Sequence, residues 1–171
     1  MDKITRVEPA DIEKVRRLFK NVVAVLTAEH ADTDGRAGAA ANLCAWSGEG
    51  LLDTREGTAP EDKFDSYVHN ALNKVLTLLD HPEHRLSFES HNMETGPYPG
   101  GARFPTELIL AISGFTWQED EVGVLWIGYK MGWIELKEAM RLVKTSQESA
   151  SLFVRLFRLF NLEQHELASI A

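Results

Sequence analysis

The sequence predicts a mainly α protein, a single compact helical domain of six to eight helices with at most one short two-stranded β pair. Three observations lead to this fold class. Apolar residues recur at helical spacing, helix-capping patterns precede several of these stretches, and the C-terminal segment is apolar around most of a helix. A chain of 171 residues suits one domain, residues 1–171, with a core that needs no disulfide or metal.

The first half begins with a well-marked helix. Glu8-Pro9-Ala10-Asp11 places proline and carboxylates at a helix start, and apolar residues then follow at helical spacing, which predicts a helix over 9–29. The small-residue stretch 38–46 is rich in alanine, the strongest helix former, and is also predicted to be helical. Gly48 and Gly50 are expected to end it.

The next segment combines a capping pattern with a possible strand pair. Thr58-Ala-Pro-Glu61 has the form of a capping box, and the helix after it should end before Pro82. Residues 85–90 alternate polar and apolar side chains, which is typical of a strand, and residues 4–7 are its predicted partner.

The second half follows a turn-rich stretch, 96–101, which marks a division between the halves but is too short to link two domains. From Pro105 onward we expect four short helices. Two capping boxes support this expectation, Thr116-Trp-Gln-Glu119 and Thr145-Ser-Gln-Glu148.

One stretch of this half leaves the fold class open. Residues 121–132 contain valines, aromatics and glycines that would also suit a strand, and the preceding capping box decides for a helix. If the stretch were a strand, the fold would be α+β, which is the alternative class.

The C-terminal segment 151–162 would expose apolar side chains over roughly 220° of a helix surface, so it needs cover. Burial in the protein's own core is the first interpretation. A homodimer formed through Phe153, Phe157 and Phe160 is the second, and attachment to a membrane surface is a distant third because acidic residues follow directly.

Charge and composition exclude several classes of protein. The net charge of −8 disfavours direct nucleic-acid binding, and residues 48–96 alone carry ten carboxylates against four cations, a net −6, so an electrostatic partner should be basic or a metal. No apolar run is long enough to span a membrane, and the N-terminus lacks a signal peptide's apolar core. With Cys44 as the only cysteine, expected to be buried and unreactive, a soluble cytoplasmic protein is predicted.

Four histidines in the acidic middle of the chain raise the possibility of a metal site: His69, His81, His84 and His91. Imidazole and carboxylate ligands suit zinc, iron or nickel. Pro82 interrupts any helix through His81 and His84, however, so the pair lacks the geometry of helical zinc motifs.

Aromatic residues concentrate in the second half, where Trp126, Tyr129 and Trp133 fall on one side of a predicted helix and could line a pocket for an apolar ligand. Their helical spacing also suits ordinary core packing.

No catalytic motif stands out, which favours a protein without enzymatic activity and leaves any cofactor unidentified. The leading hypothesis is an acidic helical adaptor, inhibitor or regulator that meets a basic protein partner through Glu61, Asp62 and Asp65. A small metal-binding protein or metalloenzyme and an apolar-ligand-binding domain are the alternatives.

Overall fold

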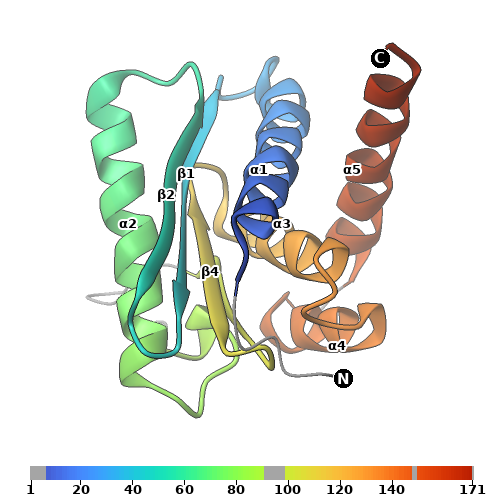
Figure 1. Ribbon diagram of the computed structural model, residues 1–171. Coiled ribbons are helices and arrows are strands. Elements are labelled where there is room, and N and C mark those ends of the chain that lie inside the picture. The colour runs from blue at the N-terminus through green and yellow to red at the C-terminus, as the bar shows by residue number, and fades with distance from the viewer. Residues whose placement is uncertain (1–6, 91–98, 148–149, 171) are drawn as a thin grey trace.

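The protein is an α+β fold in which a four-stranded sheet separates one helix from the others (Figure 1). The computed structural model describes residues 7–90, 99–147 and 150–170, without the side chains of 163–170. These ranges contain five α-helices, one short 3₁₀ helix and the sheet. The predicted bundle of six to eight helices is therefore wrong.

The sheet is antiparallel throughout and has the strand order β2-β1-β4-β3. Its strands are β1 (Gly38–Ala45), β2 (Gly50–Gly57), β3 (Gly101–Phe104) and β4 (Leu108–Ser113). β1 and β2 form a hairpin, whereas β1 pairs with β4 across a long stretch of chain, with Ala41 opposite Ile112.

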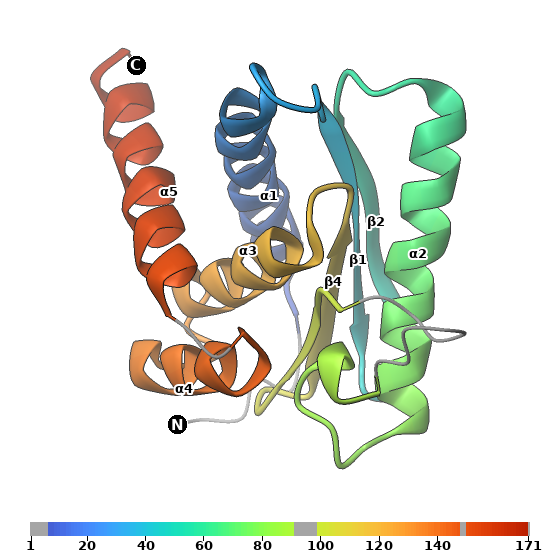
Figure 2. The same cartoon turned by 180° about the vertical axis from the view of Figure 1, so that it is seen from behind.

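The alanine-rich stretch predicted as a helix is strand β1, the central strand. Alanine's helix propensity is a weak preference that tertiary context overrides, and here both edges of the strand are paired. Small side chains suit this position because helices cover both faces of the sheet (Figure 2). Gly48, predicted to end the helix, lies in the β1–β2 turn with φ of +88°.

Two further expectations for strands and helices are corrected. Strand β4 occupies part of the region predicted to hold four helices, because a short, continuous apolar run is also typical of a buried strand. The predicted strand over 85–90 is instead a single bridge from Leu86 to Ala102 followed by the 3₁₀ helix η1 (Ser87–Ser90). Its predicted partner, residues 4–7, lies largely outside the described residues.

Helix α1 (Pro9–His30) confirms the first predicted helix, and its capping box is formed by Glu8 and Asp11. Helix α2 (Glu61–Asp80) ends before Pro82, as predicted. The predicted capping box at Thr58 is wrong, because Pro60 is the N-cap residue and no side chain caps this helix.

Helix α3 (Trp117–Lys130) confirms the capping box of Thr116 and Glu119 and shows that most of the ambiguous stretch 121–132 is helical. The fold is thus α+β for a different reason from the one that the sequence raised. Helix α4 (Leu136–Gln147) contains Thr145 in its last turn, so this residue does not begin a helix.

Helix α5 (Ser151–Ile170) is covered on one side by α1 and α3. Trp126 packs on Phe160 at a ring-centroid distance of 5.1 Å, and the side-chain amide of Asn21 donates to the Phe160 carbonyl at 2.8 Å. Val154 and Leu162 remain exposed. None of the helices in the described ranges combines the length and apolar character needed to cross a bilayer.

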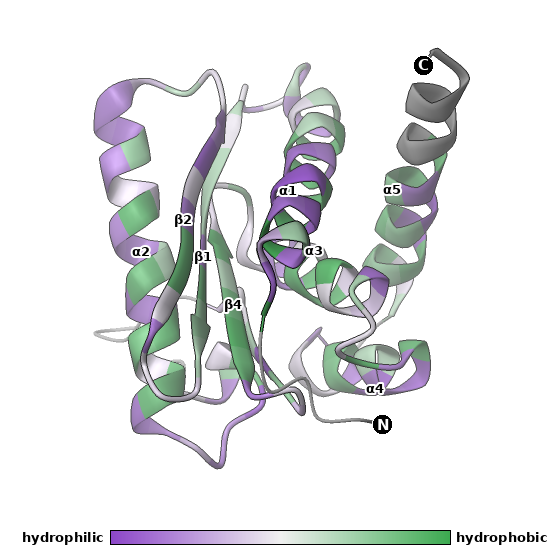
Figure 3. Cartoon of the chain, viewed as in Figure 1, coloured by the Kyte–Doolittle hydropathy of each residue, from purple (hydrophilic) through white to green (hydrophobic). Residues whose placement is uncertain are grey.

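The two faces of the sheet support two separate hydrophobic clusters. Leu110 and Ile112 face α1 and α3 and belong to the large cluster, whereas their neighbours Ile109 and Ala111 face α2 and belong to the small one. Apolar colour accordingly gathers where the helices meet the sheet (Figure 3). The small cluster leaves room for polar residues beneath α2.

Candidate ligand-binding site

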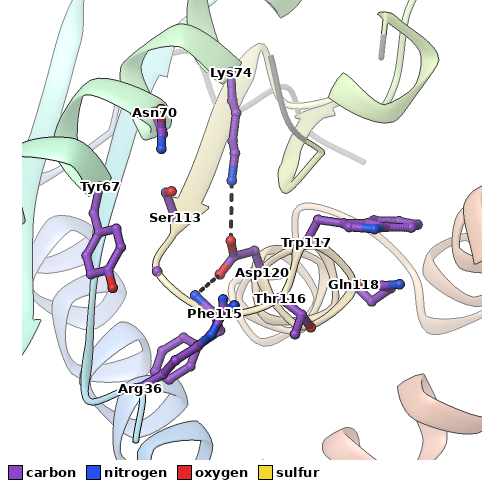
Figure 4. A pocket seen from close by; sticks show the side chains of 11 residues that line it. Arg36, Tyr67, Asn70, Lys74, Ser113, Phe115, Thr116, Trp117, Gln118 and Asp120 are labelled. Atoms are coloured by element: carbon purple, nitrogen blue, oxygen red, sulfur yellow. Dashed lines mark hydrogen bonds and ion pairs between the residues drawn. The ribbon is translucent and has the colours of Figure 1, made fainter. Parts of the chain in front are cut away.

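A hollow of about 460 Å³ lies between α2, the end of β4 and the beginning of α3 (Figure 4). The three elements meet here because β4 ends at Ser113 and the chain turns at once into the N-terminus of α3. The lining residues are Arg36, Tyr67, Asn70, Lys74, Ser113, Gly114, Phe115, Thr116, Trp117, Gln118 and Asp120.

A buried ion pair forms one wall of the hollow. Lys74 of α2 and Asp120 of α3 are 1% and 3% exposed at their side chains, and Nζ lies 3.3 Å from Oδ2. Lys74 also donates to the carbonyl of Ile112 at 2.5 Å. An ammonium group has three donors. The described part of the chain therefore supplies partners for two of them.

Burial has opposite effects on the two members of this pair. It lowers the pKa of Lys74 and raises the pKa of Asp120, because a charge loses its hydration in the interior. Each partner's charge opposes the shift of the other. Asp120 also accepts from the backbone amide of Phe115 at 3.1 Å, so its carboxylate is well satisfied.

Gly100 closes the ion pair from the side of β3. Its φ is +120°, and an added Cβ would lie 2.7 Å from Lys74 Nζ and 2.8 Å from Asp120 Cβ. Glycine is therefore required both by the backbone conformation and by the close approach of the chain to the pair.

The N-terminus of α3 forms part of the wall of the hollow. Thr116 and Glu119 cap the helix reciprocally, and the Glu119 carboxylate also bonds to Nε2 of His30 at 2.8 Å. Together with Asp34, Glu119 raises the pKa of His30 against the opposing effect of burial. The amides of Trp117 and Gln118 lie in the first turn, where a helix offers no internal acceptor.

Three polar side chains between α2 and β4 border the same opening in Figure 4, namely Tyr67, Asn70 and Ser113. Ser113 is 6% exposed as a residue, and its hydroxyl makes no hydrogen bond within the described ranges. It is not among the polar atoms that are sealed from solvent without a partner, so it is an accessible hydrogen-bonding group of the hollow.

Arg36 extends the site toward a second hollow of about 580 Å³, which also shares Tyr67 and contains Lys63. The Nε of Arg36 donates to Asp34 at 2.7 Å, which leaves the terminal guanidinium nitrogens without a partner in the described ranges. Basic groups therefore line both hollows, although the chain as a whole is acidic.

Aromatic rings form the apolar wall of the first hollow, the one that Lys74 and Ser113 line. Phe115 is buried, and Trp117 is half-buried with its ring stacked on Phe88 at a centroid distance of 5.5 Å. A site with apolar walls and a few convergent polar groups is the usual form of a small-molecule pocket.

The three aromatics predicted to line a ligand pocket lie elsewhere. Trp126 and Trp133 are fully buried in the large cluster, Trp133 against Phe104, and Tyr129 packs on Phe157. None of them lines the two hollows described above. The apolar-ligand hypothesis for these residues stays a prediction.

Two of the four predicted metal-binding histidines come together. His81 and His84 stack at 4.9 Å beside Glu83, where Pro82 turns the chain after α2. His69 lies on α2 and is hydrogen-bonded to Asn73 at 3.0 Å, outside this cluster. His91 lies outside the described residues.

The predicted acidic interaction surface lies at the exposed N-terminus of α2. Glu61 pairs with Arg55 of β2, and Asp65 lies 3.7 Å from the same guanidinium. Asp62 is exposed in the first turn, where a carboxylate favours the helix dipole. A basic partner for this surface stays a prediction.

The phenylalanines predicted to form a dimer interface are buried within one chain. Phe153, Phe157 and Phe160 are 1%, 7% and 0% exposed and contact the chain's own aromatic residues. Cys44 is buried as expected, and burial raises the pKa of its thiol to about 11.

Sequence reasoning missed the residues of the hollow. Lysine is usually a surface residue, so Lys74 was not singled out, and Ser113 and Asn70 belong to no motif. A signal was available for Lys74, because it lies three residues after Ala71 and one before Val75 on the predicted apolar face of the helix.

A scan against protein-family models, a search of curated proteins and a search of solved structures each returned no match to this chain. The geometry of the chain's own residues is therefore the basis for its proposed function.

Proposed function

We propose that the protein is a binding domain for a small organic anion, an aromatic or branched apolar group that carries a carboxylate or phosphate. The observation that carries this proposal is that Arg36, Lys74 and Ser113 line one hollow, while the terminal guanidinium nitrogens of Arg36 and one ammonium donor of Lys74 have no partner among the described residues. A group with oxygen acceptors placed between them would satisfy both.

The balance of donors and acceptors favours an anion over a cation. Arg36, Asn70 and Lys74 bring side-chain donors to the hollow. The one carboxylate in the lining, Asp120, is already bonded to Lys74 and to the Phe115 amide. Charge-assisted hydrogen bonds to an anion are about twice as strong as neutral ones.

The lining favours binding over nucleophilic catalysis. A serine nucleophile needs an adjacent general base, and no histidine is among the residues that line the hollow in the described ranges. The nearest chemistry of that kind, His30, has both ring nitrogens bonded to Asp34 and Glu119.

The test is an amide NMR titration of the full chain with benzoate, phenyl phosphate and benzyl alcohol. The two anions should give saturable shifts at amides of α2 and of the loop that starts α3, whereas the alcohol should bind at least about tenfold more weakly. Arg36→Gln and Ser113→Ala should each weaken anion binding by about three- to tenfold.

Arg55→Gln is the matched control, because Arg55 is also a partly exposed arginine paired with a carboxylate but lies outside the hollow. The variant should bind both anions as the unmodified chain does. Equal binding of alcohol and anions, or shifts spread away from these two segments, would refute the proposal.

A further inference from the structure

A second cluster of potential ligand groups lies where α2 ends, and it is separate from the hollow. His81 is the C-cap residue of α2, and Pro82 turns the chain so that Glu83 and His84 come back toward it. One potential ligand atom from each of the three side chains lies within 4.8 Å of the others. The three residues do not line the two hollows.

The individual distances show that one carboxylate oxygen contacts both imidazoles. Glu83 Oε1 is 3.2 Å from His81 Nδ1 and 3.5 Å from His84 Nε2. The two rings stack with an interplanar angle of 18°. Two imidazoles and a carboxylate this close together form a familiar ligand set for transition metals.

Ser90 bonds to one nitrogen of His84 and leaves the other nitrogen facing Glu83. Its hydroxyl lies 2.6 Å from His84 Nδ1. Hydrogen bonding of one ring nitrogen to a second group orients the ring and leaves the other nitrogen as the ligand, as is usual for metal-binding histidines. The serine comes from η1, so two elements support the arrangement.

The local electrostatics suit a cation. The C-terminal end of a helix carries partial negative charge, and His81 lies at that end of α2.

We infer that His81, Glu83 and His84 form a surface site for one divalent transition-metal ion of the zinc class, with the remaining coordination positions open to water. Nitrogen ligands disfavour Ca²⁺ and Mg²⁺, which prefer oxygen. The set differs from the predicted one, because Glu83 takes part and His69 lies outside it.

The test is a titration of the full chain with Co²⁺, followed by visible absorption, and with Zn²⁺, followed by calorimetry. One equivalent of each metal should bind. His84→Ala and Glu83→Gln should each lower the affinity by about tenfold or more, and Ser90→Ala by about tenfold through loss of ring orientation.

His69→Ala is the matched control, since this histidine is also exposed and lies on α2. It should leave the affinity unchanged. Equal affinity in the unmodified chain and in His84→Ala, or an equal loss in His69→Ala, would overturn the inference. Circular dichroism should show unchanged helicity in every variant, because the substituted side chains are not in the core.

The metal-site inference and the anion-binding proposal can be tested independently of each other. His84→Ala should bind benzoate as the unmodified chain does, because the cluster shares no residue with the hollow. Loss of metal binding with unchanged benzoate binding in His84→Ala would show that the two sites are separate.

Discussion

The two faces of the sheet differ in what they bury. The face toward α1 and α3 is covered by a large cluster that includes Phe19, Trp126 and Trp133. The face toward α2 has a cluster of five buried residues, and it also buries the charged side chains of Lys74 and Arg103. One face is a conventional core, and the other combines a small core with buried polar groups.

Each buried cation of the α2 face donates to a backbone carbonyl. Lys74 donates to Ile112, and Arg103 donates to Leu78 and lies 5.0 Å above the ring of Trp46. A buried charge is costly unless it is paired and hydrogen-bonded. The main hydrophobic core and the proposed binding site therefore lie on opposite faces of the sheet, and the hollow is on the face that already buries charge.

The largest predicted effect is on the α2 face. Lys74→Met should destabilise the protein by about 3–5 kcal/mol, because it leaves the buried carboxylate of Asp120 without its partner. Urea unfolding would measure the loss.

The double variant Lys74→Met with Asp120→Leu is the control for this prediction. It should recover most of the loss, since replacing both members of a buried pair by apolar residues is often neutral. If the double variant is as unstable as the single one, the pair is not the reason for the effect.

A pH-dependent effect is expected at Glu121, which lies beside the ion pair on α3 and is fully buried. Burial raises its pKa from 4.5 to about 7, while Ser146 and Gln147 donate to one oxygen. The unfolded chain loses this proton at lower pH than the folded one. Stability should therefore fall between pH 4.5 and 7, by up to about 3 kcal/mol.

Glu121→Gln isolates this contribution because glutamine does not titrate. Urea unfolding between pH 4 and 8 should show a smaller decline with rising pH in the variant. Parallel pH profiles for the two proteins would contradict the expectation. A smaller decline in the variant would show that the cost of burying charge extends from the α2 face of the sheet into α3.

A smaller effect is predicted for the apolar face. An added Cβ at Gly128 would lie 2.3 Å from a ring carbon of Phe104, which is fully buried. Gly128→Ala should therefore cost about 1–3 kcal/mol through overpacking, although alanine is the better helix former. Thermal unfolding would measure the change.

Gly132→Ala is the control for a glycine substitution in which the added Cβ meets no neighbouring atom. Nothing lies within 4 Å of its added Cβ, and the backbone strain at φ of +75° is the only expected penalty. If Gly128→Ala were as stable as the unmodified protein, the large cluster would not be tightly packed at this point.

Local sequence signals predicted the helices that carry them. The capping residues before α1 and α3 and the proline after α2 act within a few residues of their own backbone. The need of the C-terminal helix for cover also followed from its apolar circumference. Such effects are local, and the sequence is sufficient to detect them.

The candidate sites were predictable only in part. His81 and His84 were identified because histidines in an acidic segment are conspicuous, whereas Glu83 was absent from the predicted ligand set. The position of Lys74 on the apolar face of its helix is a local signal of burial, but nothing local marks Lys74 or Ser113 as part of a hollow. Their roles arise from α2 lying across the end of β4.

Local patterns in the chain were sufficient to predict four of the helices, the burial of Cys44 and the excess of acidic charge. The strand Gly38–Ala45 and the hollow depend on tertiary contacts instead. The reason is the range of the interactions. Strand β1 is stabilised by pairing such as that of Ala41 with Ile112, far along the chain, and short alanine-rich segments carry no local signal of such a partner.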